Sequence, residues 1–419
     1  MSRILLAWEQ GAELGHVTRL ATLAGELARR GHEPVLVLKD LAHAERLLGH
    51  TGFMLLQAPL WVGEVTGLPQ PASFAETLLH LGFLHPQALT GICRGWRSLL
   101  ALTQPDVLVC DYAPTALLAS RGLGLPRINF GDSFGVPPRT QPMPIYRHWR
   151  PEPPARVAQA EQHALNGANA VLANLGEPPL QCLAQLMEVD DEIITCHAEF
   201  EQYPNHPSRA AVPGRAARNY AGPLPNPSGG AEPSWPLNGG ARVFAYLKPA
   251  SRDFEAVLKA LRSLEVSALV FAPGVSTALQ HRHLAANLRF SDQPLCLDAV
   301  CRDCDIAICH AGASTTQALV CAGKSVLLLP THVEQMMTAK VVQALGAGLA
   351  VDFERPSADC RKLIKRLLDE PGFAAAAQEI AARHDGDDAA ARLSAMAARI
   401  EQAMAAMAAG RAAGPRLNI

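Results

Sequence analysis

The sequence has few aromatic residues, no long apolar run and almost no net charge, and each absence excludes a class of function. Aromatic residues make up 5% of the 419 positions and no basic run occurs, which argues against a surface for nucleic acid. No window approaches the roughly 18 uninterrupted apolar residues of a transmembrane helix. With 18% charged residues and a net charge of −2, the composition is that of an ordinary soluble protein.

A secretion signal and a disulfide framework are also not expected. The segment MSRILLAWEQ is apolar for only about six residues before Glu9, which is too short for a signal-peptide core. Ten cysteines lie scattered along the chain, which favours reduced thiols and a cytoplasmic location. Cys301 and Cys304 form a CxxC, but no second ligand pair accompanies them. We therefore interpret the cysteines as small buried hydrophobes.

The length exceeds that of one typical core, so two domains are expected. Short apolar runs alternate with helical patterns, which is typical of parallel, doubly wound α/β sheets. Helices are predicted from His16 to Gly31, from Leu78 to Leu102 and near 253–264. The predicted strands are SRILLAW (2–8), PVLVLK (34–39), DVLVCD (106–111), PRINF (126–130), ARVFAYLK (241–248), ALVFAPG (268–274), DIAICH (305–310) and SVLLLP (325–330).

The composition changes between residues 203 and 240, where Pro, Gly, Asn and Ser are dense. We therefore expect two Rossmann-like domains facing across a cleft, with ligands at the carboxyl ends of the strands. The predicted parts are an N-terminal domain (1–221), a linker (222–240), a C-terminal domain (241–388), and an Ala-rich helix and tail (389–419) that could pack back on the N-terminal domain.

A histidine stands where the first strand meets its helix, in GAELGHV (11–17). Asp111 ends another predicted strand, at what would be the same sheet edge. If the two strands are neighbours, Asp111 could hold one imidazole nitrogen of His16 while the other takes a proton from a substrate hydroxyl. Alternatively, His16 is a satisfied polar group and Asp111 is the N-cap of a helix starting near Pro114. The residues alone leave both interpretations open.

A second polar cluster follows the predicted strand DIAICH. Gly312 permits a sharp turn, and Ser314 and Thr315 place hydroxyls and backbone N–H groups at a helix start. The positive helix end suits a phosphate or diphosphate, and His310 would add a donor. The alternative is a Ser/Thr N-cap in a plain βαβ unit.

Glu334 and Gln335 follow the next predicted strand and would lie at the same edge. An acid and an amide can bind several hydroxyls at once, as a sugar requires. An anion site beside a polyol site indicates a nucleotide-sugar ligand.

The spacing of 25 positions between His310 and Gln335 resembles the donor signature of family 1 glycosyltransferases, the UDP-glycosyltransferase superfamily of GT-B fold. The resemblance is nearest to the bacterial antibiotic and macrolide branch. It extends over LDAVCRDCDIAICHAG (297–312) and AKVVQALGAGLAV (339–351), and ELGHVTRLATLAGELARRGHEPVLV and NYAGPLP resemble the family's opening and interdomain segment.

The resemblance implies an inverting transfer of a sugar from a UDP- or TDP-sugar to a hydroxyl of a small acceptor. It implies no covalent intermediate and no metal or other cofactor beyond the nucleotide-sugar co-substrate. His16 would be the general base and Asp111 its orienting partner. The donor-binding residues would be His310, Gly312, Ser314, Thr315, Gln317, Glu334 and Gln335.

Three positions depart from the family pattern. Ala318 stands where a ribose-binding glutamate is common, and Phe290 is only a loose candidate for the base-stacking tryptophan. Tyr246–Pro249 replaces a Gly-Ser or Gly-Thr loop, and Lys248 within it could meet a phosphate as a point charge. These departures leave the nucleotide open.

The proline-rich loops 61–74 and 131–149 belong to the predicted acceptor domain. Phe134, Tyr146 and Trp149 are candidates to contact a lipophilic acceptor, or they only pack the loops. Two other functions are considered: a catalytically silent homologue that binds a partner or ligand, and an enzyme similar to UDP-sugar 2-epimerases. The presence of both His16 and Asp111 favours the transferase.

Overall fold

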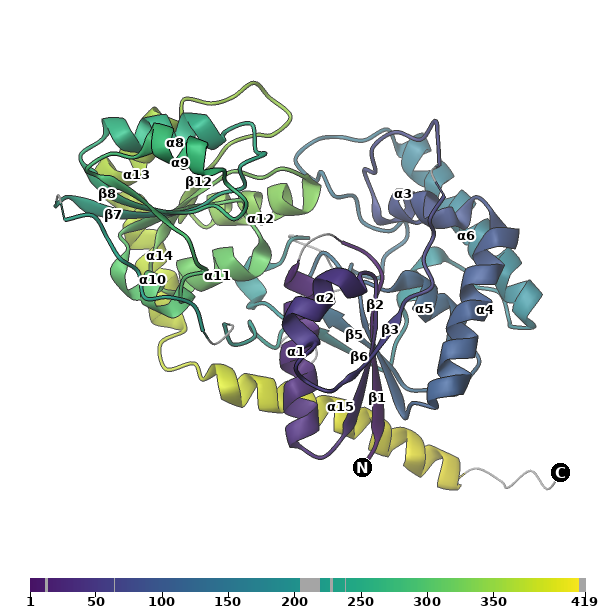
Figure 1. Ribbon diagram of the computed structural model, residues 1–419. Coiled ribbons are helices and arrows are strands. Elements are labelled where there is room, and N and C mark those ends of the chain that lie inside the picture. Colours follow the sequence, from purple (N-terminus) through teal and green to yellow (C-terminus); the bar gives the residue numbers. More distant parts are fainter. Residues whose placement is uncertain (12–13, 64, 204–218, 227–228, 238, 414–419) are drawn as a thin grey trace. The chain divides into compact units, whose positions relative to one another are not determined.

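Two parallel six-stranded sheets organise the chain (Figure 1). The computed structural model describes residues 1–11, 14–63, 65–203, 219–226, 229–237 and 239–413. The chain divides into two units. Unit 1 comprises Met1–Ala198, Tyr203–Pro225 and Ala389–Ile419, and unit 2 comprises Glu199–Gln202 and Asn226–Asp388.

In unit 1 the strand order is β3-β2-β1-β4-β5-β6, and all neighbouring strands are parallel. The interior strands are nearly continuous apolar runs because helices cover both faces of the sheet. Helices α1, α2 and α15 lie on one face and α4, α5 and α6 on the other (Figure 1). The strands are β1 (Arg3–Trp8), β2 (Glu33–Leu38), β3 (Met54–Gln57), β4 (Val107–Asp111), β5 (Arg127–Gly131) and β6 (Asp191–Ile194).

The helices of unit 1 alternate with its strands, with longer loops before α3 and α6. They are α1 (Leu14–Arg29), α2 (Leu41–Leu48), α3 (Phe74–Leu78), the π-helix η1 (Leu79–Phe83), α4 (Pro86–Thr103), α5 (Pro114–Ala119), α6 (Pro154–Leu175), the 3-10 helix η2 (Leu183–Met187) and α15 (Ala389–Ala413). A further 3-10 turn, η3 (Ala198–Phe200), lies where the chain passes from unit 1 to unit 2.

The prediction of one continuous helix from Leu78 to Leu102 is wrong. The segment is broken at Gly82, whose φ of 88° is outside the helical region, and α4 restarts with Pro86 at its first turn. Glycine adopts that left-handed conformation without steric cost, and proline is tolerated where an N–H needs no partner. Apolar periodicity continued across the break and concealed it.

Unit 2 repeats the architecture with the strand order β12-β11-β10-β7-β8-β9, again all parallel. Helices α8, α9 and α13 lie on one face of its sheet and α10, α11 and α14 on the other (Figure 1). The doubly wound α/β fold predicted for both halves is therefore confirmed. The elements are β7 (Ala241–Tyr246), α8 (Phe254–Ser263), β8 (Val266–Phe271), α9 (Thr277–His283), β9 (Leu288–Ser291), α10 (Leu297–Asp303), β10 (Ile306–Cys309), α11 (Ala313–Cys321), β11 (Ser325–Leu328), α12 (Val333–Ala344), β12 (Gly348–Ala350), α13 (Cys360–Asp369) and α14 (Pro371–Arg383).

The stretch predicted as a linker, 222–240, is divided between the units. Residues up to Pro225 belong to unit 1, and the stretch from Asn226 belongs to unit 2. Trp235 is buried there and donates from Nε1 to Asp303 at 3.3 Å. Proline and glycine thus shape a packed segment here. Residues 204–218, 227–228 and 238 of this Pro/Gly-rich region lie outside the described residues.

The C-terminal helix α15 packs on unit 1, against elements from the other end of the chain. Met396, Ala397 and Ile400 are buried in the core that contains β1 and α1. Glu401 receives hydrogen bonds from Arg30 and lies 2.9 Å from His32 Nε2, and the hydrogen bonds with Arg30 and His32 lower the pKa of Glu401 to about 2. Neither α15 nor any other helix among the described residues is long and apolar enough to cross a membrane.

The cysteines are structural in this fold. All ten are free thiols. Burial raises the pKa of Cys301 to about 12 and that of Cys304 to about 11, so both thiols of the CxxC stay protonated. A protonated, buried thiol is neither a nucleophile nor a metal ligand.

Candidate functional site

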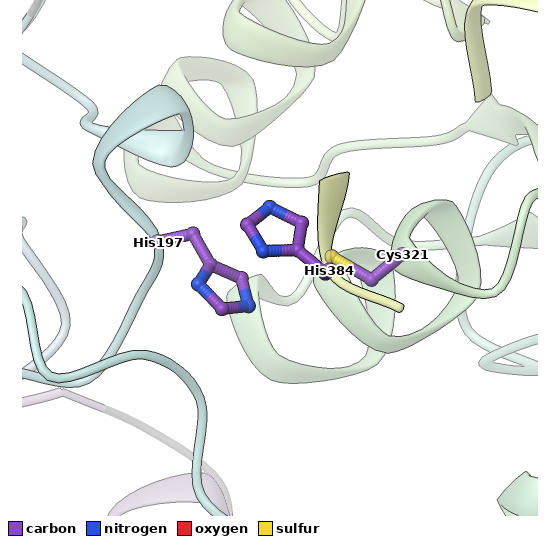
Figure 2. Close-up of side chains that lie close together, drawn as sticks. All are labelled: His197, Cys321 and His384. Atoms are coloured by element: carbon purple, nitrogen blue, oxygen red, sulfur yellow. The ribbon is translucent and has the colours of Figure 1, made fainter. Parts of the chain in front are cut away.

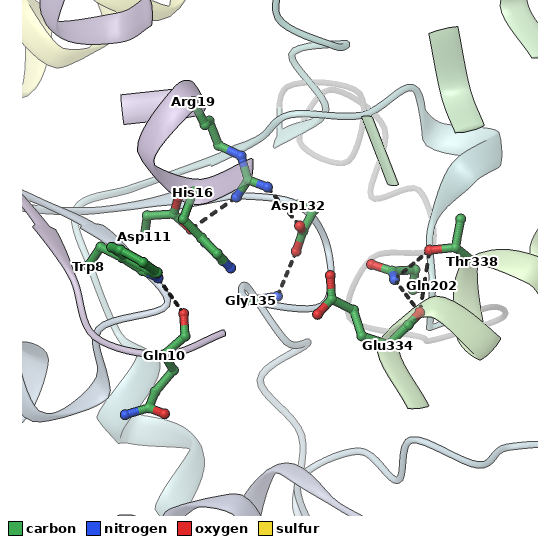
Figure 3. A network of polar contacts seen from close by, with 10 residues as sticks. All are labelled: Trp8, Gln10, His16, Arg19, Asp111, Asp132, Gly135, Gln202, Glu334 and Thr338. Atoms are coloured by element: carbon green, nitrogen blue, oxygen red, sulfur yellow. Dashed lines mark hydrogen bonds and ion pairs between the residues drawn. The ribbon is translucent and has the colours of Figure 1, made fainter. Parts of the chain in front are cut away.

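His16 and Asp111 meet at the carboxyl edge of the unit 1 sheet. The register of β1 and β4 pairs Trp8 with Asp111, and α1 then brings His16 over the end of β4. His16 Nδ1 lies 3.0 Å from Asp111 Oδ1, and both side chains are buried (Figure 3). Asp111 does not cap α5, whose N-cap is Ala113 without a side-chain bond. The alternative interpretation of Asp111 as an N-cap is therefore wrong.

The second ring nitrogen of His16 points away from Asp111. When Nδ1 donates its proton to the carboxylate, Nε2 carries a lone pair that can accept another proton. Gly11, at φ 92°, passes close to this nitrogen: a Cβ at that position would lie 2.2 Å from Nε2. Trp8 stacks on the imidazole, with ring centroids 5.5 Å apart. The imidazole is thus held between an aromatic ring and a carboxylate.

Two further residues of this network were not predicted. Arg19 donates from Nη1 to Asp111 Oδ1 at 3.0 Å and from Nη2 to Asp132 Oδ2 at 2.8 Å (Figure 3). Asp132 directly follows β5, so its position at a strand's carboxyl end was the available signal. Arg19 lies within an amphipathic helix pattern, where a charged residue is usually solvated, and carried no signal.

The environment of His16 favours its protonated form. Burial lowers the pKa of His16, but the charge and hydrogen bond of Asp111 raise it by more, and its pKa lies above the ordinary value. Arg19 opposes this effect and Asp132 adds to it. Proton affinity above that of free imidazole strengthens His16 as a proton acceptor.

Glu9 is a second buried acid at the same edge, and the sequence interpretation missed it. Its two oxygens accept the backbone N–H groups of Thr115 and Ala116 at 2.9 and 2.6 Å, in the first turn of α5. Burial raises the pKa of Glu9 to about 7, although these N–H groups oppose the rise. Glu9 therefore ties the end of β1 to the helix that follows Asp111.

The free energy of unfolding should decrease as the pH rises, because of Glu9. Its folded pKa of about 7 exceeds its ordinary value of 4.5, so between these values the folded chain binds more protons than the unfolded chain. The free energy of unfolding should decrease by about 3 kcal/mol as the pH rises through this window. Urea unfolding of the wild type and of Glu9→Gln, compared between about pH 4.5 and 8, checks this. The difference between them would stay constant with pH if Glu9 did not titrate in that range.

The three acceptor candidates lie on the loop that follows β5. Phe134 and Tyr146 are 6% and 1% exposed, and their ring centroids are 4.9 Å apart. Phe134 also meets Tyr112 edge-on at 5.7 Å, and the Tyr146 hydroxyl lies 2.8 Å from Thr77 Oγ1. Trp149 is half-buried and packs edge-on against the neighbouring His148 ring. Phe134 and Tyr146 therefore pack the loop itself.

In unit 2, both ring nitrogens of His310 bind the backbone. Nδ1 lies 2.8 Å from Leu329 O, and Nε2 lies 2.8 Å from Lys248 N, which donates to it. Because a carbonyl only accepts and an amide N–H only donates, the proton is on Nδ1. The prediction that His310 presents a donor to a ligand therefore does not match this geometry. Its ring instead holds the loop after β7 to the end of β11.

The first turn of α11 follows His310. Gly312 is its N-cap and no side chain caps it, so the predicted alternative of a Ser/Thr cap is wrong. A Cβ on Gly312 would meet nothing within 4 Å. Ser314 is exposed and Thr315 half-buried, whereas Gln317 is buried. The first N–H groups of a helix have no partner inside it, so this turn retains the donors of an anion site.

The Glu334–Gln335 pair opens α12. Gln335 is buried, and its Oε1 accepts from both the N–H and the hydroxyl of Thr331, at 2.9 and 3.0 Å. Gln202 is also buried in unit 2, where its Nε2 donates to Glu334 O and Thr338 Oγ1 (Figure 3). The amide oxygen of Gln335 therefore binds Thr331, just before the helix that contains Gln335.

The resemblance implied no metal ligands for this chain. Of the side chains drawn in Figure 2, Cys321 and His384 belong to unit 2, and their possible ligand atoms lie within 4.8 Å. His384 Nε2 pairs with Glu199 Oε1 at 2.7 Å.

Comparison with known sequences identifies the C-terminal part. Residues 256–397 match the family described as erythromycin biosynthesis protein CIII-like, C-terminal domain. A curated relative, aklavinone 7-beta-L-rhodosaminyltransferase of Streptomyces galilaeus, is 27% identical over 212 residues. That match covers 47% of this chain and 46% of the relative, so it spans about half the length of each.

Solved structures with the same fold include the glycosyltransferase VinC in complex with dTDP, at 17% identity and a TM-score of 0.64. The spinosyn rhamnosyltransferase SpnG has 19% identity and a TM-score of 0.65. Each similarity covers 96% of this chain and 100% of the other. The chain therefore has the GT-B fold of these structures, and residues 256–397 match the erythromycin biosynthesis protein CIII-like C-terminal domain.

Proposed function

We propose that this protein is an inverting glycosyltransferase that moves a sugar from a nucleotide-diphosphate sugar to a hydroxyl of a small lipophilic acceptor. The observation that carries the proposal is the buried His16–Asp111 pair. Because Asp111 binds Nδ1 of His16, Nε2 of His16 can accept a proton. The match of residues 256–397 to the erythromycin biosynthesis protein CIII-like C-terminal domain and the similarity to the curated rhodosaminyltransferase support the choice of substrates.

The proposed reaction needs a single proton acceptor. His16 Nε2 removes the proton of the acceptor hydroxyl while the oxygen attacks the anomeric carbon of the donor sugar. The nucleoside diphosphate leaves with the bonding electron pair, and the configuration at the anomeric carbon inverts. Asp111 stabilises the imidazolium that forms, because its carboxylate lies 3.0 Å from Nδ1.

In this proposal the first turn of α11 holds the diphosphate. Its backbone N–H groups and the hydroxyls of Ser314 and Thr315 supply donors at the positive end of the helix. His310 acts indirectly, since its ring keeps the backbone of Lys248 beside the end of β10. Glu334 and the amide NH₂ of Gln335 remain candidates for the sugar hydroxyls. No metal is required by these roles.

The relatives narrow the choice of substrates. VinC was solved with dTDP, and SpnG was solved with thymidine diphosphate and with the spinosyn aglycone. The curated relative is named for transfer to aklavinone. We therefore propose a TDP-sugar as donor and a lipophilic aglycone as acceptor. A silent homologue is the weaker candidate because it would have no chemical need for a buried histidine–carboxylate pair.

The donor site is tested with Gly312→Val. A Cβ at Gly312 would meet nothing within 4 Å, so we expect folding to be retained. We expect the affinity for dTDP, measured by isothermal titration calorimetry, to fall by at least about tenfold. The reason is that the valine side chain would block the access of the diphosphate to the backbone N–H donors of α11.

Gly372→Val is the matched control. Gly372 begins α14 in the same unit, and a Cβ there also meets nothing within 4 Å. Its variant should bind dTDP like the wild type. Equal affinities for all three proteins would place the nucleotide elsewhere, and binding of none of dTDP, UDP and GDP to the wild type would refute the donor assignment. Transfer itself is tested by incubating TDP-sugars with lipophilic hydroxyl compounds.

A further inference from the structure

Arg19 occupies an unusual position for a charged helix residue. It is 7% exposed, and its guanidinium bridges two carboxylates that come from different strands. One of its bonds ends on Asp111 Oδ1, the same oxygen that lies 3.0 Å from His16 Nδ1. The other oxygen, Oδ2, is buried without a hydrogen-bond partner. Arg19 and His16 therefore share one carboxylate oxygen.

The backbone is shaped for this bridge. Gly131 ends β5 where the guanidinium and the carboxylate meet, and a Cβ on it would lie 3.0 Å from both Arg19 Nη1 and Asp111 Oδ1. That distance is shorter than ordinary van der Waals contact, so a side chain at this position would press on the ion pair. The close approach depends on the absence of a side chain there.

Asp132 connects the bridge to the loop after β5. Its Oδ2 binds Arg19, while its Oδ1 accepts the N–H of Gly135 at 3.0 Å and its carbonyl accepts from Val136 at 3.2 Å. Both bonds close a turn around Phe134. One carboxylate thus fixes the turn and the guanidinium at the same time.

Several charged groups surround His16 within the described residues. Asp111 comes from β4, Arg19 from α1 itself and Asp132 from the loop after β5. On the β2 side, Lys39 donates from Nζ to Gly11 O at 2.9 Å, next to the imidazole. Arg19 opposes protonation of His16 and Asp132 favours it. Burial raises the pKa of Asp132, but Arg19 and His16 outweigh it, and its pKa is lowered.

We propose that Arg19 and Asp132 are positioning residues that place one cation and one anion beside the His16–Asp111 pair and tie the turn around Phe134 to that pair. This role rests on the proposed function, since it concerns the same base. It adds Arg19, which contacts Asp111, and Asp132, which contacts Arg19. Because the pair carries both signs of charge, removing either member has a distinct electrostatic consequence.

The test uses Arg19→Gln and Asp132→Asn in the full chain. We expect the pKa of His16, followed by NMR on histidine-labelled protein and assigned with His16→Asn, to rise in Arg19→Gln and to fall in Asp132→Asn. Loss of a cation favours the imidazolium, and loss of an anion disfavours it. In Asp132→Asn the side-chain oxygen can still accept from Gly135, so the turn is retained. The acid limb of the kcat/KM profile for sugar transfer should move in the same directions.

Arg97→Gln is the control, since Arg97 is also part of an ion pair in unit 1, with Glu177, away from this network. It should leave the pKa of His16 unchanged. The proposal would be overturned if the pKa of His16 shifted in the same direction in Arg19→Gln and Asp132→Asn. It would also be overturned if neither variant shifted this pKa more than Arg97→Gln does. Should Arg19→Gln fail to fold, Asp132→Asn decides alone. The NMR result does not depend on turnover, so absence of any sugar transfer by the wild type would refute the proposed function and leave this test intact.

Discussion

Replacing His16 by alanine should lower kcat for sugar transfer by about 100- to 10,000-fold, the range expected when a general base is removed. The imidazole is the one group of the network with a nitrogen left to take the acceptor's proton, because Nδ1 is bound to Asp111. The affinity for dTDP should stay within about twofold, since the donor residues lie in unit 2 and keep their structure. Steady-state kinetics and calorimetry on the same preparation measure both quantities.

Asp111→Asn is the companion variant. It keeps the shape of the side chain but removes the charge that stabilises the imidazolium, so kcat should fall into the same range. Combining it with His16→Ala should add little further loss, because the two residues act as one unit. Normal turnover by His16→Ala would contradict the general-base role. Loss of dTDP binding in that variant would instead indicate a folding defect.

Gly167→Ala should destabilise unit 1 by about 3 kcal/mol, the upper end of the usual cost of overpacking. Gly167 lies in α6, and an added Cβ would be 1.9 Å from the carbonyl oxygen of Phe83 and 2.9 Å from its carbonyl carbon. Both atoms are backbone, so no side-chain rotation can relieve the overlap. Helix α6 would have to move away from η1. Helix α3, which directly precedes η1, carries Thr77, and the Thr77 hydroxyl is the partner of the Tyr146 hydroxyl.

Gly91→Ala should have the opposite effect on stability. Gly91 lies in α4, is exposed, and would place its Cβ in open space. Replacing glycine by alanine in an exposed helix should therefore stabilise the protein by about 0.5 to 1 kcal/mol. Urea unfolding curves of the two variants and the wild type decide the matter. Equal stability of both variants would mean that α6 can shift at little cost.

Where the sequence predicted the fold well, the signal was local. The runs that became β1 and β4 are apolar at nearly every position because both faces of these strands are covered, and such runs stand out. The outer strands β3 and β12 are short and only partly buried, so they were missed. The break at Gly82 was missed as well, because apolar spacing continued through it.

The same contrast applies to the site. His16 and Asp111 could be placed together because residues at the carboxyl ends of adjacent parallel strands share one edge. Arg19 could not be recognised, since a charged residue in an amphipathic pattern is normally solvated, whereas Glu9 directly follows β1 and offered the same strand-end signal as Asp132. Glu9 binds the first turn of α5, and Arg19 binds Asp132 in the loop after β5. Both partners are distant in the sequence.

The sequence by itself determined the doubly wound architecture, the strand-end positions of His16 and Asp111, and the family of the C-terminal part. These features follow from periodicity and from motif spacing, which a linear chain records directly. Only the tertiary structure decided that Arg19 and Asp132 join the network, that His310 binds backbone on both nitrogens, and that Gln335 binds Thr331 just before its own helix. Each of these depends on which buried polar groups find partners, and partners distant in the sequence are specified only when the chain is folded.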